Sequence, residues 1–138
     1  MRSARRYVLG IDTNVLVRLL VTDDAGQTRR ARQIVAHATA TDGAVFVSLP
    51  VMVETEWVLR SRYGLDKEAT LGALRSLLAA RELAFEDEPA IEEALFYWAD
   101  STSGFADCLI GAHNRQLGCR ATATFDLKAS RVPGFVTI

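Results

Sequence analysis

Tyr7-Val-Leu-Gly-Ile-Asp-Thr-Asn-Val-Leu16 contains a short apolar run that ends at a carboxylate, with an apolar helical pattern directly behind it. Because the run is apolar and partly β-branched, we expect a buried strand over residues 6–11. A buried strand that ends at Asp12 directs this carboxylate toward the carboxyl end of the sheet, where open α/β folds bind their ligands. The stretch therefore predicts an α/β fold and a ligand site at Asp12.

Strands alternate with helices along the rest of the chain, which predicts a mostly parallel central sheet flanked by helices. The sequence has no linker, internal repeat or low-complexity tract, so we expect a single domain over residues 1–138. The further expected strands cover residues 44–48, 83–86, 120–124 and 134–137. The expected helices cover residues 13–20, 24–39, 50–62, 66–81, 88–99 and 104–117.

The composition is that of an ordinary globular protein. The 138 residues are 49% hydrophobic and 24% charged, and this length suffices for one domain with its own core. No apolar run approaches the roughly 20 residues that a membrane helix needs. The basic start of the chain is followed by only a short apolar run, which makes a poor signal peptide. We therefore expect a cytoplasmic protein.

The charge balance neither demands nor excludes a polyanionic substrate. The net charge of −1, from 16 basic and 17 acidic residues, does not by itself indicate a nucleic-acid-binding protein. If four acids formed one metal-filled cluster, 13 acidic residues would face 16 basic ones, a balance of +3. The two cysteines, Cys108 and Cys119, lack the spacing of a zinc site, and we expect Cys108 to be a core residue.

Three aspartates recur in one kind of setting, after a strand or in the first turn of a helix: Asp12, Asp107 and Asp126. Each alone could equally be a helix cap or a turn residue. Together, they would gather near one edge of a parallel sheet, where two carboxylates about 4 Å apart repel by about 4 kcal/mol at an effective dielectric of roughly 20. Such a cluster needs a cation. Oxygen ligands without His or Cys favour Mg²⁺ or Mn²⁺, which are typical of phosphoryl chemistry.

A fourth acid is expected on the helix that begins at Pro50, where two positions compete. Glu54 shares its helical face with three apolar residues, including Trp57, and a Glu on a core-facing stripe is costly to bury unless it is paired or bound to metal. Glu56 has neighbours that are nearly as apolar. Helical spacing alone therefore leaves both positions open.

Other phosphoryl-transfer domains fit the sequence less well. A phosphatase of the haloacid-dehalogenase type needs a second Asp two residues after the first, where this chain has Asn14. A receiver domain needs paired acids on its first strand and a Lys on a late strand, and neither is evident. Glycine-rich nucleotide-binding loops are absent. A non-catalytic interaction domain remains an alternative, which would keep its partner after the acids were replaced.

Four segments carry a family resemblance: Gly10-Ile-Asp-Thr-Asn-Val-Leu-Val-Arg18, Val53-Glu-Thr-Glu-Trp-Val-Leu59, Phe105-Ala-Asp-Cys-Leu-Ile-Gly-Ala112 and Ala123-Thr-Phe-Asp126. In this order they resemble the PIN domain, most closely the VapC-type toxins of bacterial toxin–antitoxin pairs. This family is known as metal-dependent ribonucleases held in check by a cognate antitoxin. The resemblance implies a Mg²⁺-dependent endoribonuclease, for which Mn²⁺ substitutes, with RNA as substrate and a small VapB-like antitoxin as partner. It leaves a homodimer open.

The resemblance also implies which residues form the site. It prefers Glu54 to Glu56 because the family's Glu precedes the Trp position by three residues. It implies that one acidic quartet serves as both metal ligands and catalytic residues. The members of this quartet are Asp12, Glu54, Asp107 and Asp126.

Two polar residues match the family pattern, and one residue differs from it. Asn14 and Thr124 fall where the family often has polar groups lining the site. Many relatives carry an acid just before the Phe-Ala-Asp segment, where this chain has Gly104, with Asp100 four residues earlier. The number of metal ions therefore stays open.

Several arginines lie on the helices that follow Asp12. Arg29, Arg30 and Arg32 form a basic cluster on one predicted helix. This cluster is either a solvated face or a contact for RNA phosphate or for an acidic antitoxin segment. Arg18 follows Asp12 by six residues, so we expect it near the rim of the site.

Overall fold

The computed structural model of the chain describes residues 9–138. These residues form two compact units. Unit 1 comprises the chain up to Gly64 together with Ser76–Glu86, and unit 2 comprises Leu65–Arg75 and Asp87–Ile138. Helix α4 (Lys67–Ala79) contributes to both units.

Unit 1 is built on a short parallel sheet. Strand β1 (Val45–Val47) pairs in parallel with β2 (Leu83–Phe85). On the other side of β1, Gly10 forms a parallel bridge with Phe46, and the amide of Ile11 donates to the Phe46 carbonyl at 3.1 Å. The strand expected over residues 6–11 therefore pairs with β1 where it is described, while its first three residues lie outside the described part of the chain.

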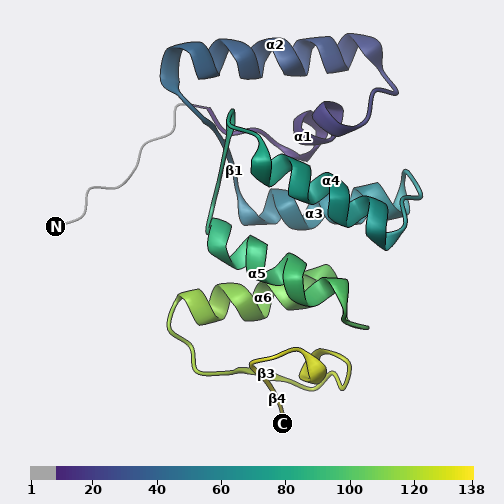
Figure 1. The fold of residues 1–138 in the computed structure, drawn as a ribbon, viewed down its shortest axis with the longest axis vertical. Helices are drawn as coiled ribbons and strands as arrows, with labels where there is room; N and C mark the ends of the chain where they lie inside the picture. The colour runs from purple at the N-terminus through teal and green to yellow at the C-terminus, as the bar shows by residue number, and fades with distance from the viewer. Residues whose placement is uncertain (1–8) are drawn as a thin grey trace, which may run out of the picture. The chain divides into compact units, whose positions relative to one another are not determined.

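Three helices surround this sheet within unit 1. Helix α1 (Thr13–Leu20) packs against both α2 (Ala25–Asp42) and α3 (Leu49–Ser61), and α1 and α2 can be followed side by side in Figure 1. Helix α2 begins where Asp24 accepts a hydrogen bond from the amide of Gln27 at 3.0 Å, which satisfies one of the free donors of its first turn. The buried core of the unit includes Leu16, Val17, Val45, Val47, Met52 and Leu59.

Unit 2 contains a helix pair and a second small parallel sheet. Helix α5 (Glu88–Ala99) lies along α6 (Phe105–Gln116), as Figure 1 shows. Strand β3 (Thr122–Thr124) pairs in parallel with β4 (Phe135–Thr137), and the short 3-10 helix η1 (Ala129–Arg131) lies between them in sequence.

Aromatic packing holds unit 2 together. The rings of Trp98 and Phe105 meet edge to face, with their centroids 5.6 Å apart, and both are buried. On α6, Gly111 makes room for a third ring, because a Cβ at this position would come within 2.5 Å of the Phe135 ring. At the start of α5, Asp87 caps the helix in a left-handed conformation and its carboxylate lies 2.6 Å from Nδ1 of His113.

The predicted fold class is confirmed, because helices alternate with strands and both strand pairs are parallel. The predicted helix over 13–20 matches α1, whereas α2 runs three residues past the predicted end at 39. The strands are shorter than predicted, since only three residues of each enter a ladder. The single domain over residues 1–138 stays a prediction. Among the described residues, no helix is both long and apolar enough to cross a membrane.

The aromatic pair of unit 2 gives a test of this core. Replacing Phe105 with Ala should lower the free energy of unfolding by about 3–5 kcal/mol, because a fully buried ring leaves a cavity. Urea unfolding followed by circular dichroism measures the change. Phe96→Ala is the matched control on α5, because its ring is 68% exposed, and its cost should stay below about 1 kcal/mol. Equal losses for the two variants would contradict this description of the core.

Candidate active site

Asp12 lies between Gly10, which bridges to β1, and the start of α1. Its backbone is extended, and Oδ1 accepts a hydrogen bond from the amide of Val15 at 3.1 Å. The side chain is exposed, and this cap leaves Oδ2 as the oxygen that can bind a further partner. The cap and the ligand interpretations are therefore compatible, because each uses a different oxygen.

Thr13 connects Asp12 to a second predicted carboxylate. Its hydroxyl donates a hydrogen bond to Oε1 of Glu54 at 3.0 Å, across 41 residues of sequence. This contact lies where α1 packs against α3, so unit 1 brings Asp12 and Glu54 to neighbouring positions. Sequence reasoning missed Thr13, because a threonine at the start of a helix is unremarkable until its partner is known.

The structure separates Glu54 from its competitor. Glu54 is exposed, whereas Glu56 is only 3% exposed and pairs with Arg60 one turn later. The hydrogen bond between Arg60 and Glu56 is the main cause that raises the pKa of Arg60, so the Arg60 guanidinium stays charged. The expectation that Glu54 faces the core was wrong, because α3 turns Met52, Thr55 and Leu59 inward and leaves Trp57 60% exposed.

Asp107 lies in the first turn of α6, within unit 2. It is half-buried, and its Oδ2 accepts a hydrogen bond from the hydroxyl of Ser103 at 2.8 Å. Ser103 is itself buried, and its amide donates to the hydroxyl of Ser101 at 2.9 Å. The turn before α6 therefore fixes one oxygen of Asp107, and Gly104 at the helix cap supplies no side-chain hydrogen bond of its own.

Asp126 follows β3 in unit 2 and is exposed. Its amide donates to the hydroxyl of Thr124 at 3.0 Å, and its Oδ1 accepts from the amide of Lys128 at 2.8 Å. Thr124, predicted as a polar residue lining the site, thus holds the turn that carries Asp126. Both interactions are local and leave Oδ2 of Asp126 available to a ligand.

The four predicted carboxylates divide evenly between the units: Asp12 and Glu54 belong to unit 1, and Asp107 and Asp126 belong to unit 2. Within each unit, the described residues contain no group of three or more His, Cys, Asp or Glu positioned to hold a metal ion. The donor set nevertheless fits a hard divalent cation, because it consists of carboxylate oxygens with one oxygen of each already oriented. The four-carboxylate metal site stays a prediction.

A cleft of about 680 Å³ opens beside Asp12 within unit 1. It is formed by α1, α2 and the end of α3. Arg18 lines it, as predicted, and is held by Asp23 and by the Tyr63 hydroxyl at 3.2 Å. The hydrogen bond to Tyr63 is the main cause that raises the pKa of Arg18, so this side chain stays cationic. The residues lining the cleft are Asp12, Asn14, Val15, Arg18, Gln27, Arg30, Ala31, Ile34 and Arg62.

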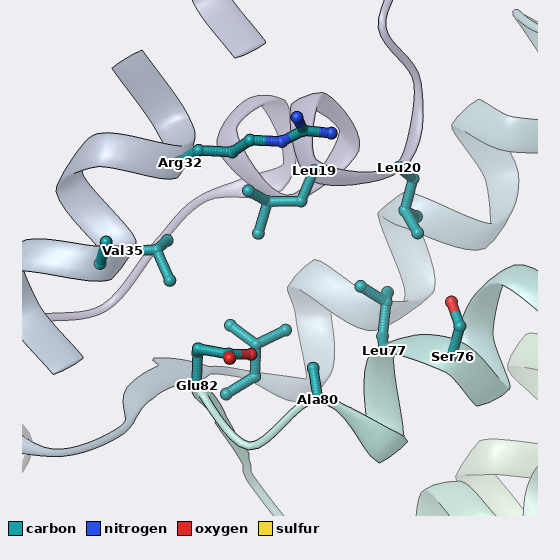
Figure 2. A pocket seen from close by; sticks show the side chains of 10 residues that line it. Leu19, Leu20, Arg32, Val35, Ser76, Leu77, Ala80 and Glu82 are labelled. Atoms are coloured by element: carbon teal, nitrogen blue, oxygen red, sulfur yellow. The ribbon is translucent and has the colours of Figure 1, made fainter. Parts of the chain in front are cut away.

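A second hollow of unit 1, of about 380 Å³, has a different chemistry. Figure 2 shows leucines, among them Leu19, Leu20 and Leu77, around a largely apolar space. Arg32 and Glu82 provide its charged groups. None of the four predicted carboxylates lines this hollow, whereas Asp12 alone of the four lines the larger cleft.

The model of the PIN domain matches residues 10–134 of the chain. The chain belongs to the PIN domain family. Among solved structures, it is similar to the crystal structure of Mycobacterium tuberculosis VapC20, described as a Sarcin-Ricin loop cleaving toxin. The two chains are 20% identical, with a TM-score of 0.41, and the alignment covers 91% of this chain and 95% of that one. No curated protein matches the chain.

Two glutamates on α3 of this PIN domain should respond differently to replacement. Glu54→Ala should weaken Mn²⁺ binding by about tenfold or more, with little change in stability, because the side chain is exposed. Glu56→Ala should lower the free energy of unfolding by about 1–2 kcal/mol without changing Mn²⁺ affinity, because it leaves a buried gap and frees Arg60. Calorimetry measures the affinity and thermal unfolding the stability. Weaker Mn²⁺ binding in the Glu56 variant alone would reverse the assignment.

Proposed function

We propose that this PIN domain is a Mg²⁺-dependent endoribonuclease toxin that hydrolyses RNA phosphodiester bonds in the cytoplasm. The match to the PIN domain over residues 10–134 is the observation that carries this proposal. The hydrogen bond from Thr13 to Glu54 supports it, because it holds two of the predicted acids of unit 1 at neighbouring positions. A basic cleft beside Asp12 is suited to an anionic polymer.

The proposed metal site uses the acidic quartet, and Mn²⁺ would substitute for Mg²⁺. When bound, the metal activates water and stabilises the leaving oxygen of the phosphodiester. Carboxylates without nitrogen or sulfur ligands suit such a cation. The quartet consists of Asp12, Glu54, Asp107 and Asp126.

Each acid has a proposed role that follows from its local contacts. Asp12 and Asp107 would hold the metal directly, and the oxygens that their hydrogen bonds leave open are Oδ2 in Asp12 and Oδ1 in Asp107. Glu54 would either bind the metal or act as the base that takes a proton from water, through Oε2, because Oε1 accepts the hydrogen bond of Thr13. Asp126 would hold a second metal ion or a water of the outer shell. Asn14 and Thr124 complete the polar lining of the site.

Metal dependence tests the proposed chemistry. Cleavage of a pool of cellular RNA should require Mg²⁺ or Mn²⁺ and stop in excess chelator. Asp12→Asn should abolish cleavage, while the melting temperature measured without metal stays level or rises, because Asn caps a helix as well as Asp and removes a repelling charge. Cleavage at full rate in chelator would contradict the metal mechanism. A large fall in melting temperature would instead assign Asp12 to a structural role.

We further propose that a small VapB-like antitoxin, with a DNA-binding part and a blocking segment, holds the toxin inactive. An arginine of the blocking segment would pair with the carboxylates, because a guanidinium bridges two of them in a fork. Expression of this chain alone should slow bacterial growth, and co-expression of a small protein encoded beside it should restore growth. The Asp12→Ala variant is the control and should be harmless. Equal toxicity of this variant, without a co-purifying partner, would contradict the pairing.

A further inference from the structure

The cleft beside Asp12 carries two cations that form no internal ion pair. Arg30 on α2 and Arg62 at the end of α3 both line it and are exposed. Within residues 9–138, neither side chain makes an ion pair or hydrogen bond, whereas Arg18 in the same cleft is neutralised by Asp23. The two free guanidiniums therefore outweigh the single carboxylate of Asp12, so the cleft favours an anion.

Arg18 differs from these two arginines because its side chain is held in place. Its guanidinium is clamped by Asp23 and Tyr63, and the Tyr63 hydroxyl donates to Asp23 at 3.1 Å. Its Nε is buried and has no hydrogen-bond partner among the described residues. Arg18 therefore lines the cleft in a fixed position, whereas the side chains of Arg30 and Arg62 can change rotamer to contact a ligand.

The rest of the lining suits a nucleotide better than a small inorganic anion. Val15, Ala31 and Ile34 give the cleft an apolar surface, and Ile34 is 45% exposed although it is a large apolar residue. A ribose or base can lie on such a surface. Asn14 and Gln27 add side-chain amides, which both donate and accept hydrogen bonds and can meet the edge of a base.

We propose that this cleft binds one nucleotide of the RNA strand, with Arg30 and Arg62 as the ligands of its backbone phosphate. The proposal rests on the proposed ribonuclease function and names the part of unit 1 that holds the substrate next to Asp12. An acidic protein segment would also be attracted by the arginines. The nucleotide is favoured because the apolar surface and the amide side chains lie in the same cleft as the cations.

Neighbouring residues on α2 provide a matched control. Arg29 precedes Arg30, is also exposed, and lines a different hollow together with Thr22 and Ala25. Replacing either arginine with Gln removes one charge from the same helix. A general electrostatic effect would weaken RNA binding in both variants, whereas a phosphate contact in the cleft would weaken it in Arg30→Gln alone.

The test is fluorescence anisotropy with a 2′-O-methyl RNA oligonucleotide, which resists cleavage, in chelator and over a series of salt concentrations. Arg30→Gln and Arg62→Gln should each weaken binding by about tenfold, because each loses one charge-assisted contact. Each should also lower the slope of log affinity against log salt by about 0.7. Arg29→Gln should stay within about twofold of the wild type. Arg30→Lys should regain the salt slope, because it restores the charge.

A cleavage assay with unmodified RNA in Mg²⁺, run in parallel, shows whether a failure concerns the nucleotide site or the proposed ribonuclease function. If the wild type cleaves RNA and all variants bind the oligonucleotide equally, the cleft is not the nucleotide site although the nuclease function stands. Arg30→Gln and Arg62→Gln could instead bind the oligonucleotide as the wild type does but no longer bind the co-expressed antitoxin. This result would assign the cleft to an acidic protein segment and overturn the proposal. If the wild type neither binds nor cleaves, the proposed function itself fails. Circular dichroism checks that each variant is folded.

Discussion

The turn from Asp12 to Val15 determines the position of two acids at once. Asp12 caps α1 by accepting a hydrogen bond from the Val15 amide, and the hydroxyl of the adjacent Thr13 donates to Glu54 on α3. A cap of this kind contributes about 1 kcal/mol to helix stability. The Thr13 contact is exposed, so its net contribution to folding is small and its consequence is mainly geometric. One short segment therefore starts a helix, follows the bridge of Gly10 to β1, and orients both predicted site acids of unit 1.

This arrangement has an electrostatic cost that the surrounding residues reduce. Carboxylates repel one another wherever they are neighbours, as the acids of unit 1 are, and each acid of the quartet has one oxygen that accepts a hydrogen bond from a nearby O–H or N–H donor. The cleft that Asp12 lines also contains arginines, none of which forms an ion pair with Asp12 among the described residues. The donors orient the carboxylates without neutralising them, which leaves their charge available to a cation.

The sequence predicted the local features well and the long-range ones poorly. Helix α1 has its predicted bounds because Asp12 caps it and no distant contact is needed to define its start. The choice between Glu54 and Glu56 could not be made from periodicity, since both have apolar neighbours. Two contacts distinguish the surroundings of these residues, one from Thr13 to Glu54 across 41 residues and one from Arg60 to Glu56 in the same helix. The choice of Glu54 as the acid of the site stays a prediction. The strand lengths also depend on pairing partners that periodicity does not specify.

The arginines of α2 also show that proximity in sequence does not predict which surface a side chain lines. In the sequence, Arg29, Arg30 and Arg32 form one basic cluster, but each helical step rotates a side chain by roughly 100°. Arg30 lines the cleft of Asp12, Arg29 lines a neighbouring hollow, and Arg32 lines both that hollow and the apolar one. A cluster that appears uniform in sequence is therefore divided among three surfaces. Only the surface that also contains an acid of the quartet is suited to bringing a phosphodiester and a metal-binding carboxylate together.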